Sequence, residues 1–155
     1  MSENTGTNTG TGTGTPSRTA SIDNLVVEAV MDLIDGLGNY ALITRGALGT
    51  GNGITCEVAT STVDGVFLSK EKIVFLDLTF NAKHSNLQIV SDTLGKIVDY
   101  LTMLKEYPSG EGWQIYDISG GMPVLPTVIG RSDQNEWIMA AGVIVKYYRK
   151  EVESE

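Results

Sequence analysis

The chain has 155 residues, of which 41% are hydrophobic and 19% are charged. This length indicates one domain, and the apolar content excludes disorder of the whole chain. A formal net charge of -8 argues against a surface that neutralises nucleic-acid phosphates. Cys56 is the only cysteine, which excludes an intrachain disulfide and a cysteine zinc site. No apolar run approaches the roughly 18 residues of a membrane span, and the N-terminus lacks a signal pattern, so we expect a cytoplasmic protein.

Residues 1–19, "MSENTGTNTGTGTGTPSRT", consist almost wholly of Gly, Thr, Asn and Ser. They contain almost nothing apolar to bury, which predicts a flexible N-terminal arm ahead of a single domain at residues 20–155. The alternative is an arm that becomes ordered against neighbouring subunits.

An amphipathic helix of about 16 residues is predicted to follow Ser21, which stands at the N-cap position. Apolar residues recur at helical spacing from Ile22 to Leu37. Gly36 and Gly38 provide the end of the helix.

A period of two then replaces the helical spacing and predicts three strands, at residues 40–46, 54–62 and 72–82. Val74, Leu76, Leu78 and Phe80 should share one face of the third strand. The glycine-rich residues 47–53 between the first two strands are not followed by Gly-Lys-Ser/Thr, so they predict a loop and not a phosphate-binding P-loop.

Ser85 and Gln88 have the spacing of a capping box, which predicts the start of a second helix with its apolar face from Leu87 to Leu104. Two further strands are expected at residues 113–119 and 136–150. The order α-β-β-β-α-β-β predicts an α+β fold with a mostly antiparallel sheet and both helices packed on one face.

The chain has few candidate catalytic or metal-binding residues. His84 is the only histidine and is expected at the surface or in a capping role. Asp77 lies within an apolar strand, where it is expected to face solvent or pair with a neighbour, and Cys56 should be a small buried residue. We therefore expect no catalytic group, no cofactor, no metal site and no small-molecule substrate, and the protein should not be an enzyme.

The stretch "GRSDQNEW" predicts a hairpin tip that contacts another protein. Its polar turn precedes a long final strand, and aromatic residues in the last two strands favour cross-strand packing or a protein interface. The candidate interface residues are Arg131, Ser132, Asp133, Gln134, Asn135, Glu136 and Trp137.

Three segments resemble the tail terminator proteins (tail completion, or minor capsid, proteins) of long-tailed bacteriophages. They are the helix "SIDNLVVEAVMDLIDG", the strand "KIVFLDLTFNAK" running into "SNLQIVSDTLGKIVDYLTML", and "PTVIGRSDQNEWIMAAGVIVKYYR". The last is similar to the family's pattern of a proline, an aliphatic-Gly-Arg step, a polar turn and a final strand that starts at an aromatic residue. The resemblance covers about residues 20–150, and the Thr/Gly-rich arm departs from it.

The resemblance implies a structural virion protein, assembled in the host cytoplasm and located at the head-proximal end of the tail. It implies a homohexameric ring that caps the tail tube, stops its polymerisation and joins it to head-completion (connector) proteins. Double-stranded DNA would only pass through the lumen. Two alternatives stay open: another tail or head–tail connector component such as a tail tube protein, and a small ligand-binding domain or enzyme.

Overall fold

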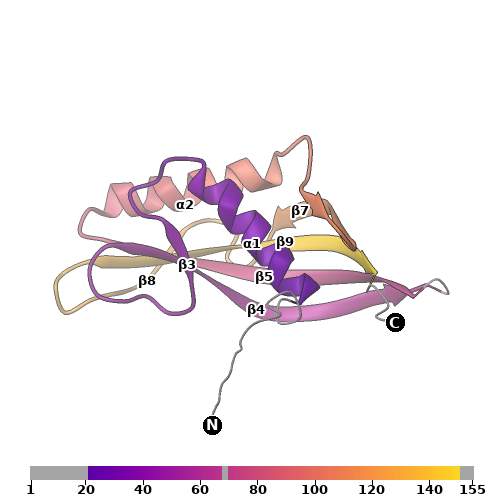
Figure 1. Ribbon diagram of the computed structural model, residues 1–155. Helices are drawn as coiled ribbons and strands as arrows, with labels where there is room; N and C mark the ends of the chain where they lie inside the picture. The colour runs from indigo at the N-terminus through magenta and orange to yellow at the C-terminus, as the bar shows by residue number, and fades with distance from the viewer. Residues whose placement is uncertain (1–20, 68–69, 151–155) are drawn as a thin grey trace, which may run out of the picture.

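The computed structural model describes residues 21–67 and 70–150, so the predicted N-terminal arm lies outside the described residues. Two helices and one seven-stranded sheet form the described part of the chain (Figure 1). In chain order the elements are α1 (Ile22–Asp35), β3 (Ile43–Arg45), β4 (Gly53–Val66), β5 (Glu71–His84), α2 (Leu87–Thr102), β6 (Ser109–Gly110), β7 (Trp113–Gly120), β8 (Thr127–Arg131) and β9 (Trp137–Lys150). The predicted order is confirmed, with β6 and β8 as two short strands that the sequence pattern did not predict.

The sheet has the strand order β3-β4-β5-β9-β7-β6, and β8 pairs with β9 outside this path. All its pairs are antiparallel except β3 with β4, which run parallel. Figure 1 shows both helices above the same face of the sheet. The α+β fold class with helices on one face is therefore confirmed.

Helix α1 begins as predicted, because the Ser21 side chain accepts a hydrogen bond from the backbone N–H of Asn24 at 3.1 Å. Its buried side chains are Val26, Val27, Val30 and Ile34. The carboxylate of Asp35, at the last turn, accepts a hydrogen bond from the N–H of Ile43 at 2.9 Å. This bond ties the end of α1 to the start of β3.

The start of α2 differs from the prediction. Asn86, and not Ser85, is the N-cap, and its side-chain oxygen accepts from the N–H groups of Gln88 and Ile89. Gln88 donates to Asp92 one turn later and does not reach back to close a capping box. An Asn side chain at this position satisfies two early helical N–H groups by itself, which is why the box is unnecessary.

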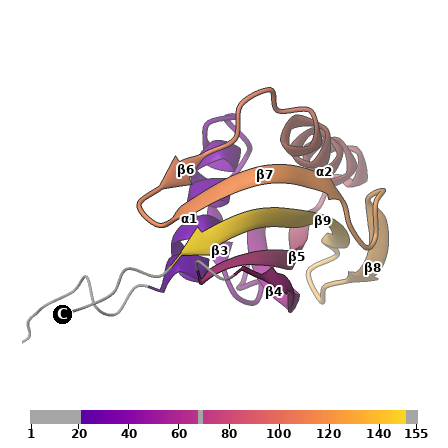
Figure 2. The same cartoon turned by 90° about the vertical axis from the view of Figure 1, so that its right-hand side faces the viewer.

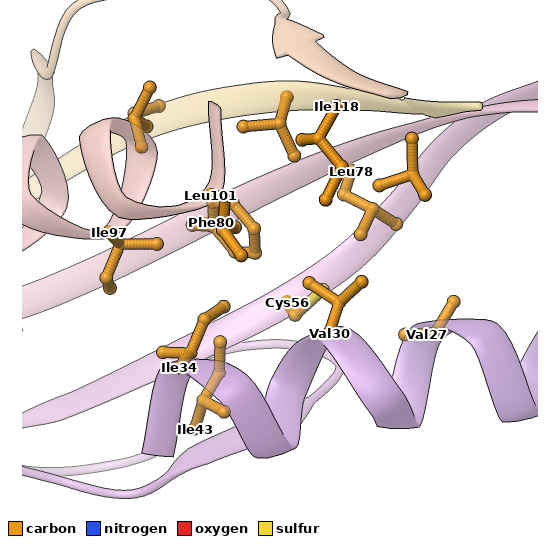
Figure 3. Close-up of a cluster of buried hydrophobic side chains, with 14 of the residues drawn as sticks. Val27, Val30, Ile34, Ile43, Cys56, Leu78, Phe80, Ile97, Leu101 and Ile118 are labelled. Carbon is orange, nitrogen blue, oxygen red and sulfur yellow. The ribbon is translucent and has the colours of Figure 1, made fainter. Parts of the chain in front are cut away.

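The core lies between the helices and the long central strands β5 and β9 (Figure 3). On β5 the predicted face is confirmed, with Val74, Leu76, Leu78 and Phe80 all buried. The buried side of α2 packs against this face through a row that includes Leu94, Ile97, Val98 and Leu101. One apolar cluster thus joins both helices to the sheet.

At each edge of the sheet, the outer strands pair with only part of the long strand beside them. Beside β9, strand β8 pairs with Trp137–Ala140 and β7 pairs with Val143–Arg149, so they occupy the same edge at opposite ends. Figure 2 shows β8 and β6 at these opposite ends. On the other edge, β3 covers β4 only from Ile54 to Cys56.

Neither described helix is long and apolar enough to cross a membrane.

Candidate protein interface

The predicted hairpin tip is a tight turn between β8 and β9. The N–H of Ser132 donates to the carbonyl of Glu136 at 2.9 Å, and the N–H of Asn135 donates to the carbonyl of Ser132 at 3.0 Å. Asn135 has a φ of 62°, in the left-handed region that asparagine tolerates better than most residues. The polar residues of this stretch therefore form the hairpin that the sequence predicted.

Ser132 is the centre of the turn's side-chain hydrogen bonds. Its hydroxyl donates to the Glu136 carboxylate at 2.8 Å and accepts from the N–H groups of Gln134 and Glu136. Bonds of this kind between a short polar side chain and nearby backbone hold a turn in one conformation. The tip is consequently preorganised and not a loose loop.

Glu136 also anchors the hairpin to the body of the sheet. It forms an ion pair with Lys83 of β5 at 3.7 Å, and only 8% and 11% of the two side chains, Lys83 and Glu136, are exposed. The Lys83 ammonium also donates to the carbonyl of Gly49 in the glycine-rich loop. Glu136 thus positions the tip from inside, and it is not one of the side chains that the tip presents to a neighbour.

The outward-facing part of the tip is polar. Arg131, Asp133, Gln134 and Asn135 are exposed, whereas Ser132 and Trp137 are half-buried. The Arg131 guanidinium lies 4.2 Å from the centre of the Trp137 ring and donates to the carbonyl of Asn135. A cation held over an aromatic face in this way is fixed in place while remaining accessible.

Next to the tip lies an exposed apolar surface that the sequence analysis did not identify. It is formed by β8 and the segment before it, and we call it the β8 apolar surface; its residues and their exposed fractions are Met122 (86%), Val124 (51%), Leu125 (73%), Val128 (43%) and Ile129 (58%). Neighbouring exposed apolar side chains in this number mark contact surfaces more often than single ones do. The run "MPVLPTVI" contains the signal, but it lacks the alternation that identifies a strand and its exposed face.

The segment before β8 is held closely against β9. The N–H of Gly121 donates to the carbonyl of Gly142, and the N–H of Gly142 donates to the carbonyl of Pro123 at 2.7 Å. A Cβ atom at Gly142 would lie 2.8 Å from the carbonyl oxygen of Met122. Gly142 therefore allows the backbone approach that fixes the β8 apolar surface.

A second exposed apolar surface lies at the other end of the sheet, on the β4–β5 hairpin. Its residues are Val63 (51% exposed), Val66 (64%) and Phe67 (46%), and we call it the hairpin apolar surface. β8 pairs with the first residues of β9, whereas Glu71, at the start of β5, pairs with Lys150 at its end. The two apolar surfaces thus stand at opposite ends of the 14-residue strand β9.

The remaining candidate residues have structural partners. The ring nitrogen Nδ1 of His84 accepts from the N–H of Asn86 at 3.0 Å, next to the N-cap of α2. Asp77 accepts from the hydroxyl of Thr60 on β4 at 2.6 Å. The Cys56 thiol is fully buried, and burial raises its pKa to about 12. These observations agree with the capping, strand-pairing and core roles predicted for the three residues.

Within residues 21–67 and 70–150 no group of three or more His, Cys, Asp and Glu side chains could hold a metal ion. The aromatic residues of the last strands pack as predicted at one point, where the rings of Tyr116 and Tyr148 lie 4.7 Å apart. A groove beside them is lined by residues that include Trp113, Tyr148 and Arg149.

No protein-family model and no curated protein sequence matches this chain.

Proposed function

We propose that this chain is a ring-forming tail terminator of a long-tailed bacteriophage. The proposal rests on the resemblance of the three segments and on one structural observation. The β8 apolar surface and the hairpin apolar surface are unlike one another and lie at opposite ends of one sheet.

Two unlike surfaces favour head-to-tail association. A twofold dimer uses the same patch on both subunits, whereas contact between different patches is heterologous and produces a closed ring or an open polymer. Each copy would offer its β8 apolar surface on one side and its hairpin apolar surface on the other. The burial of both surfaces in every subunit would stabilise the assembly.

In this proposal the ring, a homohexamer, caps the tail tube and stops addition of tube protein. The preorganised polar tip, with the Arg131 guanidinium held over Trp137, would meet the tail tube protein or the head-completion protein. Double-stranded DNA would pass through the lumen without a specific contact. The site of action would be the head-proximal end of the phage tail.

Inhibition of tube growth tests this function. The protein is added to tail tube protein during its polymerisation, and tube length is measured by negative-stain imaging. We expect shorter tubes that carry a ring at one end. Leu125→Lys should lose this effect because it places a charge in the β8 apolar surface, while Met103→Lys, at the exposed C-cap of α2, should retain it.

The alternative function is that of a tail tube protein. It would also use heterologous contacts, but these would produce an open polymer and not a closed ring. In that case the chain alone would form open-ended tubes, and addition to another tube protein would not shorten its polymers. Either result would contradict the terminator function.

A further inference from the structure

Strand β4 has a long free edge. Its pairing with β3 ends at Cys56, and from Glu57 to Val66 no strand among the described residues covers its outer side. Nine of these ten residues are exposed; Gly65 is the exception. A row of unpaired backbone N–H and C=O groups of this length is a template for another strand.

The opposite edge of the sheet also has a free strand. Strand β8 pairs with β9 on one side, and no described strand lies on its other side. Four of its five residues are exposed, including Val128 and Ile129. The sheet therefore has an unpaired edge on each side, and the two edges differ in sequence and length.

The directions of the two edge strands are compatible. β4 runs antiparallel to β5, β5 runs antiparallel to β9, and β9 runs antiparallel to β8. β8 consequently runs opposite to β4 in the same sheet. If a second copy continues the sheet, its β8 meets the free edge of β4 as an antiparallel partner, the arrangement that short strands form most readily.

The short length of β3 also allows a neighbour's β8 to pair with β4. β3 occupies the outer side of β4 up to Cys56, and the free edge begins at the next residue. A neighbour's β8 would lie in line with β3, directly beyond its end. Val58, Val63 and Val128 would then share the helix-bearing face, because their cross-strand partners Leu78, Val74 and Met139 all belong to the core.

We propose that β8 of each subunit pairs antiparallel with the Glu57–Val66 edge of the next subunit and joins their sheets into one continuous wall. This inference rests on the proposed ring and names the strands that form its subunit contact. The occupant of the β4 edge is a second copy of this chain.

The spacing of strands gives the diameter that a ring of six copies would have. If Ser61 of one copy lies opposite Val128 of the next, the two edges are offset by six residues along β9, because Ser61 is aligned with Val145 through Leu76 and Val128 pairs with Met139. This offset along the strands, combined with four strand-to-strand spacings across the sheet, places neighbouring copies about 28 Å apart. The strands would then be inclined to the ring axis, as in β-barrels. Six copies would form a wall about 50 Å across, wide enough for a DNA duplex.

Disulfide crosslinking tests the pairing. Val128→Cys is combined in turn with Val58→Cys, Ser61→Cys and Val63→Cys, because the register along β4 is open. Each pair lies on the helix-bearing face, and native Cys56 is fully buried. Oxidation should convert at least one double variant into a ladder of covalent oligomers on non-reducing gels, since each subunit carries both halves of the contact.

Two controls test whether the crosslinks report the proposed contact between β8 and β4. A mixture of the two single variants should stop at the covalent dimer. Thr62→Cys with Val128→Cys should not crosslink, because Thr62 pairs with Phe75 on the face opposite the helices. Circular dichroism verifies that each variant is folded.

The outcomes separate this inference from the proposed function. A wild-type ring with no crosslink in any of the three pairs would overturn the strand pairing and leave the terminator function standing. A ladder from a protein that forms open tubes would support the pairing and overturn the terminator function. A monomer without crosslinks would overturn both.

Discussion

Lys83 of β5 and Glu136 of the hairpin turn form a buried ion pair that joins the candidate interface to the end of a central strand of the sheet. The Glu136 carboxylate also accepts from Ser132, and the Lys83 ammonium also donates to the carbonyl of Gly49. One pair of charges thus connects the hairpin, β5 and the glycine-rich loop. We expect the conformation of the polar tip to depend on this ion pair.

Glu136→Ala should lower the free energy of unfolding by about 3 kcal/mol, because it leaves the Lys83 charge buried without its partner. Chemical denaturation measures this change. Asp133→Ala, on the exposed part of the same turn, is the control and should leave stability nearly unchanged. Equal stability of Glu136→Ala and wild type would show that the ion pair does not hold the turn.

Gly142→Ala should destabilise the protein by about 1–3 kcal/mol, because the new methyl group meets the carbonyl oxygens of Met122 and Leu78. Gly130→Ala is the matched control in a neighbouring strand, where a Cβ atom meets nothing within 4 Å. Thermal unfolding distinguishes the two. A loss of stability in Gly130→Ala as large as in Gly142→Ala would contradict the close approach of the β7–β8 segment.

Stability should fall as pH rises from about 9 toward 12. Burial raises the pKa of the Cys56 thiol to about 12 and that of the Tyr40 hydroxyl to about 12, whereas their ordinary values are about 9 and 10. Between the unfolded and folded values the native state binds more protons, so the stability present below the unfolded pKa is lost as pH increases. Denaturation across this range measures the decline.

Cys56→Ala should show a shallower decline over the same pH range, because the contribution of the raised thiol pKa is removed. The comparison uses the change with pH and not the absolute stability, since the smaller side chain leaves a cavity. Identical slopes for wild type and Cys56→Ala would mean that the thiol does not contribute.

The helix-free face of the sheet should line the lumen of the ring and bind DNA weakly. By strand alternation this face carries Glu57, Glu71 and Asp77 as well as Lys146 and Lys150, and the Lys146 ammonium lies 3.3 Å from the carboxylate of Asp117. Acidic groups repel a phosphate backbone over about 8 Å at physiological salt. The wild-type ring should therefore show no tight, salt-sensitive binding of double-stranded DNA.

Glu57→Lys with Asp77→Lys should create salt-sensitive DNA binding, because two acidic groups on the proposed lumen wall become cations. Asp92→Lys with Asp99→Lys, on the exposed side of α2, changes the net charge by the same amount and is the control. Fluorescence anisotropy at two salt concentrations measures both. Stronger binding by the α2 variant than by the Glu57 and Asp77 variant would contradict the assignment of the lumen face.

Much of the fold follows from sequence periodicity. The helical spacing after Ser21 and the alternation from Val74 to Phe80 identify their elements because each buries one face. β8 was not predicted because it is short and exposed on both sides, so its sequence does not alternate between apolar and polar residues. Val58 alternates as a core residue would, yet it is 37% exposed because β4 continues beyond the part that the core covers.

The candidate interface was predictable only in part. Its polar turn has a local signature, and the hairpin formed by Ser132 and Asn135 is confirmed. The parallel pairing of β3 with β4 spans the glycine-rich loop, and the ion pair of Lys83 with Glu136 joins residues far apart in sequence; no local pattern specifies either of them. The free edges of β4 and β8 likewise become visible only when all strand partners are known.

Native mass measurement of the full-length protein, combined with negative-stain imaging, tests the proposed ring most directly. We expect a discrete species of six chains that appears as a closed ring with an open centre, at concentrations where Leu125→Lys is monomeric. A wild-type protein that remains monomeric, or that grows into open-ended tubes of no fixed mass, would contradict a ring-forming tail terminator.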